Sequence, residues 1–181
     1  MRLVVAPLLH RCSLHPHPSC LDPVLESAAV ELRGNSGATV LDARLATRPG
    51  RLSLPEGQLD PLRLWEHTCL ELFTVRANEP GYVEWNFSPT GQVTRFVFSA
   101  YRERAHTSFP DLVSVRVERA GETVRMVVEG DLGVDQMKAG AVTVVARDTS
   151  GSVAFWAAAH PRPQPDFHDS AGFVLTRTPP R

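Results

Sequence analysis

The sequence is poor in cysteine, in net charge and in long apolar runs. Its three cysteines cannot all pair with one another. Cys69 lies in an apolar run, where a buried free thiol is expected, and Cys12 and Cys20 could form a disulfide, although nothing requires one. A net charge of −1 and a pI near 6.7 provide no basic surface for a phosphate backbone or an anionic membrane. We therefore expect neither a nucleic-acid partner nor a membrane partner.

The sequence also lacks a convincing targeting segment. The opening MRLVVAPLL contains a short apolar stretch, but Pro7 interrupts it and no small-residue cleavage site follows. We expect a first strand here and a cytoplasmic protein. No apolar stretch approaches the length that spans a bilayer.

What the chain does contain is typical of a globular protein. Hydrophobic residues make up 43% and charged residues 22% of its 181 residues. This length fits one domain of ordinary size, and residues 1–181 are expected to form it.

The dominant hydrophobic period is two. Val113, Val115 and Val117 alternate with polar residues, Val124, Met126 and Val128 follow, and Gly121 between the two runs indicates a hairpin turn. Further short runs cover 39–46, 71–75, 82–87, 93–101, 142–146, 153–159 and 173–176, with Pro- and Gly-rich turns between them. The pattern predicts an all-β antiparallel β-sandwich of immunoglobulin or jelly-roll type, with about ten strands.

Helical signals are scarce. Val24–Leu32 is the longest candidate, with Asp22 as its cap and Pro23 at its first position, although its second half could equally be a strand. Asp131–Lys138 could form a single turn. We expect at most one short helix, and loops at the Pro-rich segments 15–18 and 161–165.

The hairpin Trp65–Pro89 is the most informative segment. Its expected strands are Trp65–Val75 and Tyr82–Pro89, with a tip at Arg76–Gly81. Only one register parity places Leu70 and Leu72 beside Trp85 and Phe87, and a slip of one residue would put carboxylates in the core. That parity gathers polar side chains on the opposite face: His67, Glu71, Glu84, Asn86 and Ser88.

Two carboxylates close together on a sheet repel each other unless something neutralises them. A shared proton, a cation, a partner such as Arg95 or Arg102, or a sugar hydroxyl could do so. A structural network or a solvated outer face would account for the same residues.

A second polar cluster lies near the C-terminus. If Phe155, Ala157 and Ala159 point inward, Trp156 and His160 point outward, followed by Asp166 and His168. The spacing of the two histidines matches no compact metal signature, so no metal site is predicted.

These segments resemble a known family. Those that carry the resemblance are Leu64–Phe73, Glu84–Gly91, Tyr101-Arg102, Ala159-His160-Pro161 and Pro165-Asp166-Phe167-His168. They look like the DOMON-like domain proteins of bacteria, a group of β-sandwiches related to haem- or sugar-binding DOMON domains and to family 9 carbohydrate-binding modules. The resemblance extends from about Leu14 to about Leu175. It implies the fold more than a particular activity.

Carbohydrate binding is the leading functional hypothesis. A sugar needs an aromatic platform for its apolar ring face and planar polar groups for its hydroxyls. Trp65, Tyr101 and Trp156 could supply the platform. The full set of candidate ligand-binding residues is Trp65, Glu66, His67, Glu71, Glu84, Asn86, Tyr101, Arg102, Trp156, His160, Asp166 and His168.

Other functional hypotheses remain open. The resemblance implies b-type haem held by Met and His, but only Met126 and Met137 follow the initiator, so no cofactor is predicted. A hydrolase could use Glu71 and Glu84 as acid and base. Without a nucleophile elbow, a phosphate-binding loop or a metal helix signature, we expect binding of a small molecule or saccharide rather than catalysis. A protein partner could also use an exposed sheet face or edge.

Overall fold

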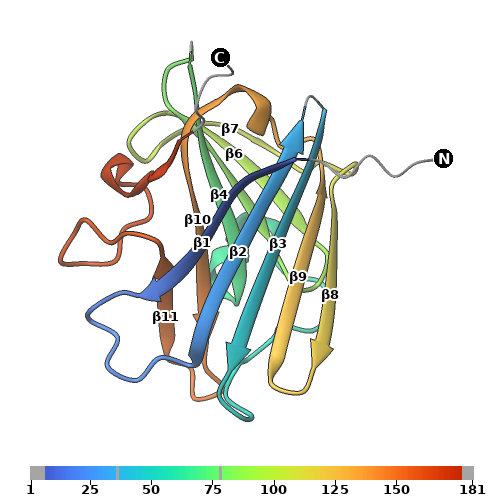
Figure 1. Cartoon of the computed structure of the whole chain (residues 1–181), viewed down its shortest axis with the longest axis vertical. Helices are drawn as coiled ribbons and strands as arrows, with labels where there is room; N and C mark the ends of the chain where they lie inside the picture. Colours follow the sequence, from blue (N-terminus) through green and yellow to red (C-terminus); the bar gives the residue numbers. More distant parts are fainter. Residues whose placement is uncertain (1–6, 36, 78, 177–181) are drawn as a thin grey trace.

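The computed structural model describes residues 7–35, 37–77 and 79–176, which form strands joined by short 3-10 helices (Figure 1). The strands are β1 Leu8–Pro16, β2 Leu25–Asn35, β3 Ala38–Thr47, β4 Cys69–Arg76, β5 Tyr82–Phe87, β6 Val93–Ala100, β7 Glu103–Ser108, β8 Ser114–Ala120, β9 Thr123–Gly130, β10 Met137–Arg147, β11 Val153–Ala157 and β12 Leu175–Thr176. The 3-10 helices are η1 Pro61–Glu66, η2 Val134–Gln136 and η3 Ser170–Gly172. None of the described helices is long and apolar enough to cross a lipid bilayer.

All strands in the described part of the chain belong to one antiparallel sheet. Its order is β7-β6-β5-β4-β10-β11-β1-β2-β3-β9-β8, and β12 pairs with β10. Strand β1 joins two halves of this sheet, one from β7 to β11 in this order and the other from β2 to β8. It does so because Leu8–Leu14 pairs with β2 while His15 and Pro16 pair with β11. The sheet curls so that β2, β3 and β9 lie in front of β4 and β6 in Figure 1.

The main core lies between the two halves. Leu32 and Leu41 from one half share an apolar cluster with Leu72, Trp85 and other residues from the other half. Alternate residues of each strand point into this cluster, and their removal from water is the main stabilising contribution to the fold.

The all-β antiparallel prediction is confirmed. The strands form one curled sheet of 12 strands in place of the two separate sheets expected of a sandwich. Strands β8 and β9 form the predicted hairpin around Gly121, and η2 forms the turn expected within Asp131–Lys138. Cys69 is a buried free thiol as predicted, and Cys12 and Cys20 are also free.

The helix candidate Val24–Leu32 is wrong, and the strand left open for its second half is confirmed, because Leu25–Asn35 forms β2. The Asp22-Pro23 start signal is local, whereas Ala28, Val30 and Leu32 alternate into the core and pair with β1 and β3. Tertiary pairing therefore overrides the cap.

Several strand boundaries, and the presence of one strand, also differ from expectation. Of the predicted first strand, residues 1–6 lie outside the described residues, and β1 continues through His15 and Pro16, which were expected in a loop. Strand β4 begins only at Cys69, since Trp65 belongs to η1. Strand β7 was not predicted, because most of its residues are exposed and it shows no alternation.

Gly81, which precedes β5, is required by close packing. Its φ is +76°, and an added Cβ would lie 1.8 Å from the carbonyl oxygen of Phe98, whereas Gly91 has a φ of +90° and no neighbour within 4 Å. We expect Gly91→Ala to cost about 1–2 kcal/mol, the strain of a left-handed backbone alone. Gly81→Ala should cost clearly more in urea unfolding. If both substitutions lower the free energy of unfolding equally, the backbone around Phe98 moves aside at no cost and the close contact does not require glycine.

Candidate functional site

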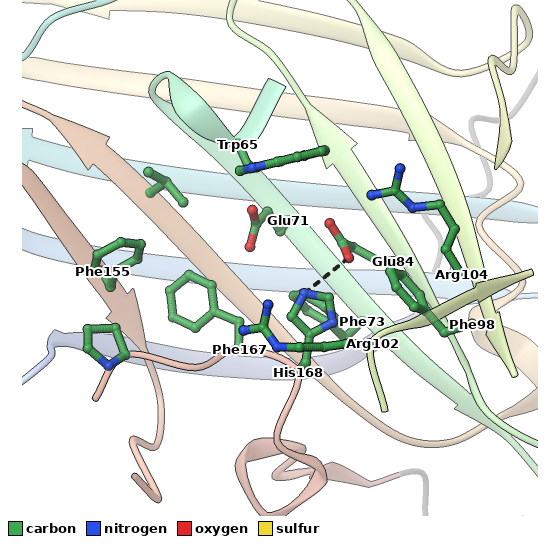
Figure 2. Close-up of a pocket in the computed structure, with 12 residues that line it drawn as sticks. Trp65, Glu71, Phe73, Glu84, Phe98, Arg102, Arg104, Phe155, Phe167 and His168 are labelled. Atoms are coloured by element: carbon green, nitrogen blue, oxygen red, sulfur yellow. Dashed lines mark ion pairs between the residues drawn. The ribbon is translucent and has the colours of Figure 1, made fainter. Parts of the chain in front are cut away.

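A cavity of about 470 Å³ lies on the face of β4, β5 and β10 that points away from the main core (Figure 2). The lining residues that β4 and β5 contribute have the strand parity opposite to that of Leu70, Leu72 and Trp85. They are Trp65, Glu71, Phe73, Glu84, Phe98, Arg102, Arg104, Val145, Phe155, Pro165, Phe167 and His168.

Two carboxyl groups form the floor of this cavity. Glu71 on β4 pairs with Asn86, and Glu84 on β5 pairs with Phe73, so the two glutamates are diagonal neighbours on one face. Their exposed fractions are 3% and 5%. Glu71 Oε2 accepts a hydrogen bond from Thr143 Oγ1 at 2.8 Å, and Glu84 Oε1 accepts one from Asn86 Nδ2 at 2.5 Å.

Burial changes the protonation of this pair. Removal from water, reinforced by the charge of Glu84, raises the pKa of Glu71 to about 8. Burial also raises the pKa of Glu84, against the hydrogen bond from Asn86 and the positive charges of Arg104 and Arg102. Glu71 is therefore protonated at neutral pH, which relieves the repulsion between the two groups.

His168 lies beside Glu84 as a neutral imidazole. Burial, with the positive charge of Arg102, lowers its pKa to about 4. The Tyr82 hydroxyl accepts from the backbone N–H of Arg102 at 3.1 Å and lies 2.7 Å from His168 Nδ1, so its proton is available for that nitrogen. This leaves the His168 proton on Nε2, which lies 3.7 Å from Glu84 Oε2.

Asp166 fixes the segment that carries His168. Its carboxylate accepts hydrogen bonds from Tyr101 Oη at 2.6 Å, Arg102 Nη2 at 2.9 Å and the backbone N–H of His168 at 3.0 Å. Arg102 has a φ of 57°, a left-handed conformation that costs about 1–2 kcal/mol outside glycine. These bonds offset that cost and hold the β6–β7 turn against the C-terminal segment.

Aromatic side chains form the walls. Trp65 of η1 lies above the carboxyl groups in Figure 2 and packs edge-on against Phe96 at 5.7 Å between centroids. Phe155 and Phe167 pack edge-on at 5.7 Å on the opposite side. The guanidinium of Arg104 lies 4.0 Å from the Phe96 centroid, and no described carboxylate lies within salt-bridge distance of it.

Two local structures position these walls. Pro61 starts η1, Asp60 caps it by accepting from the Leu62 N–H, and Thr94 Oγ1 donates to the Pro61 carbonyl. On the other side, His160 Nε2 lies 2.9 Å from the His15 carbonyl and His17 Nε2 lies 3.0 Å from that of Arg162. The two histidines therefore fasten the segment leading to Phe167 against β1.

The structure brings some of the predicted residues together. Trp65, Glu71, Glu84, Arg102 and His168 line the cavity. Three further predicted residues lie behind this lining. Asn86 donates a hydrogen bond to Glu84, and Tyr101 donates one to Asp166, which accepts from the backbone N–H of His168. The C-terminal segment thus reaches the hairpin through His168.

Other predicted residues lie elsewhere. Glu66 bonds to Arg63 and Arg147, and His160 is bonded to β1. His67 also lies outside the cavity lining, where its backbone N–H bonds to the Leu64 carbonyl.

The expected outward orientation of Trp156 is wrong. Its 3% exposed side chain lies in the main core, and Phe155 faces the cavity instead. This half of the sheet is covered on both faces, so hydrophobicity could not indicate which face Phe155 occupies.

The sequence reasoning missed Phe73, Phe98, Arg104, Val145, Phe155, Pro165 and Phe167. Two signals were available. Phe73 has the same parity as Glu71 on β4, and Phe167 lies within the Pro-Asp-Phe-His motif. Arg104 gave no signal, because strand β7 has no hydrophobic pattern.

The two methionines do not fit as haem ligands at this cavity. Met126 and Met137 are 1% and 2% exposed in the core between the two halves, on the side of β4 away from the cavity. Within residues 7–35, 37–77 and 79–176, no group of three or more His, Cys, Asp or Glu side chains is arranged to hold a metal ion.

Solved structures provide likenesses at low identity. A candidate carbohydrate-binding protein from Bacteroides uniformis aligns over 88% of this chain and 83% of its own, with 13% identity and a TM-score of 0.55. Two structures of a family 9 carbohydrate-binding module from Caldicellulosiruptor kristjanssonii contain glucose and cellotriose. Their TM-scores are 0.45 and 0.48 and their identities 11% and 10%, over 73% and 84% of this chain and 66% and 72% of theirs.

The first of these likenesses shows a shared β-fold. No protein-family model matches the chain. Comparison with curated proteins found no relative. The resemblance to DOMON-like proteins therefore stays a prediction.

The carboxyl pair predicts a pH-dependent stability. The folded-state pKa of Glu71 is about 8 against an ordinary 4.5, so the folded state holds a proton that the unfolded state releases. This stabilisation is complete below about pH 4.5 and is lost as the pH rises through about 8. The lowered pKa of His168 makes the folded state more stable as the pH rises, but only below about pH 6.5, the ordinary pKa of histidine.

We therefore expect the free energy of unfolding to fall between about pH 6.5 and about pH 8, and to fall less in Glu71→Gln. Urea unfolding at each pH measures both slopes. Glu26→Gln, on the exposed side of β2, is the matched control and should keep the wild-type slope. Identical slopes in wild type and Glu71→Gln would contradict the raised pKa.

Proposed function

We propose that the cavity binds a saccharide. The observation that carries the proposal is the combination of aromatic walls with a floor of two carboxyl groups in one concave site. Sugar rings present apolar C–H faces that pack on aromatic rings and hydroxyls that need directional hydrogen bonds. Trp65 provides the aromatic face that lies directly above both carboxyl groups.

Polar groups in the cavity are available to a ligand. Among the described residues, Glu71 Oε1 and Glu84 Oε2 have no hydrogen-bond partner, although both residues line the cavity. The protonated Glu71 can also donate, and the guanidinium of Arg104 can donate to two neighbouring hydroxyls. The volume of about 470 Å³ lies within the range usual for small-molecule sites.

The site is also held in place before any ligand binds. Tyr82, His168, Arg102 and Asp166 form one connected set of hydrogen bonds around the floor. Groups that are already ordered lose less conformational entropy on binding. The fold shared with a candidate carbohydrate-binding protein, and the resemblance of the motifs to DOMON-like proteins, support the same proposal.

Titration with a panel of neutral, acidic and amino saccharides, followed by calorimetry and tryptophan fluorescence, tests the proposal. Trp65→Ala removes the aromatic platform, and Glu84→Gln replaces a carboxyl group of the floor by a neutral amide. Each should weaken binding by about tenfold or more. Trp65→Ala removes the packing surface for the sugar ring, and Glu84→Gln weakens a hydrogen bond that contributes about 1.5–3 kcal/mol when one partner is charged.

Glu66→Gln is the matched control, because Glu66 follows Trp65 but its side chain bonds to Arg63 outside the cavity. It should bind as the wild type does. If no saccharide of the panel binds, or if Trp65→Ala binds as tightly as the wild type, the proposal is overturned. Release of reducing sugar during incubation would assign the two carboxyl groups to hydrolysis instead.

A further inference from the structure

No arginine or lysine of the described residues lies within salt-bridge distance of the two carboxyl groups on the cavity floor, although the charges of Arg102 and Arg104 act on Glu84 from farther away. The only basic nitrogen within salt-bridge distance among the described residues is His168 Nε2, at 3.7 Å from Glu84. Arg102 is paired with Asp166. The floor therefore combines high negative charge capacity with almost complete burial, which is costly unless a cation or a proton is supplied.

Each carboxyl group turns one oxygen toward the cavity. Thr143 occupies Oε2 of Glu71 and Asn86 occupies Oε1 of Glu84, leaving Glu71 Oε1 and Glu84 Oε2 without hydrogen-bond donors in the described part of the chain. Glu71 is 97% removed from solvent, with an exposed fraction of 3%. An ammonium group has three donors and could bond to both free oxygens at once.

The aromatic walls favour the same chemistry. Figure 2 places the Trp65 ring above the two carboxyl groups and Phe73 and Phe98 beside them. The faces of aromatic rings attract cations, and the attraction strengthens when water is excluded. A neutral hydroxyl gains nothing from this property.

We infer that the preferred ligand is a saccharide carrying a protonated amino group, held with its ammonium between Glu71 and Glu84. This inference rests on the proposed function and names the class of sugar. Binding exchanges one cation for another: the ligand ammonium enters, both carboxyl groups ionise, and the proton of the pair passes to solvent.

The other charged groups around the floor are compatible with this exchange. His168 is neutral, and the charge of Arg102 is balanced by Asp166. The exposed Arg104 lies with its guanidinium 4.0 Å from the Phe96 centroid and 5.6 Å from the Trp65 centroid. Its charge lowers the pKa of Glu84, so it favours the ionised carboxylate that the exchange requires, while it repels the incoming ammonium group.

The experiment compares matched sugars that differ in one substituent. Glucosamine, glucose and N-acetylglucosamine, with the corresponding galactose series, are titrated into the full chain by calorimetry near pH 6, where the amine is charged. We expect the amino form to bind about tenfold or more tightly than either neutral form, a difference of about 1.4 kcal/mol, because hydrogen bonds between charged groups are stronger than those between neutral groups. Repeating the titration in buffers of different ionisation enthalpy should show release of up to one proton.

Glu71→Gln should abolish both the proton release and the preference, bringing the affinity ratio of amino to neutral sugar close to one. Glu66→Gln and Glu26→Gln should keep both. Equal affinity for glucose and glucosamine, or tighter binding of the N-acetyl form, would overturn the inference and leave saccharide binding intact. Failure of every sugar to bind would overturn the proposed function, and the inference with it.

Discussion

Glu71 and Glu84 lie next to each other on β4 and β5 with almost no access to water, and the arrangement of the cavity follows from this constraint. Two adjacent carboxylates in a nonpolar setting cannot both ionise without a compensating charge. Thr143 and Asn86 each satisfy one oxygen, and protonation of Glu71 relieves the repulsion. What remains is a pair of oxygens directed into the cavity.

Burial of this pair depends on chain segments outside the two strands that carry it. The 3-10 helix η1 precedes the hairpin and places Trp65 over it, while the segment around Phe167 and His168 returns from the C-terminal part of the chain. Asp166 holds that segment to Arg102 over 64 residues of sequence separation, and His160 holds it to β1 over 145. The second face of this half-sheet is therefore closed by loops and short helices, with a cavity left between them.

This construction suits binding better than a solvated sheet face would. The hydrogen bonds of Tyr82, His168, Arg102 and Asp166 fix the lining side chains before a ligand arrives. A rigid aromatic slot above two hydrogen-bonding groups can recognise both the apolar and the polar surface of a sugar ring. In the proposed complex, the two carboxyl groups of the floor would then favour a sugar that carries a protonated amino group.

The sequence by itself determined the all-β antiparallel class, the β8–β9 hairpin and the parity that separates Leu70 and Trp85 from Glu71 and Glu84. These features follow from period-two alternation, in which a slip of one residue would place carboxylates in the core. Only the tertiary structure chose between helix and strand for the segment that forms β2, turned Trp156 to the core and Phe155 to the cavity, and brought Arg104 to the cavity. Where both faces of a sheet are covered, hydrophobicity no longer distinguishes them, and only the pairing register and the covering segments determine which side chain meets the cavity.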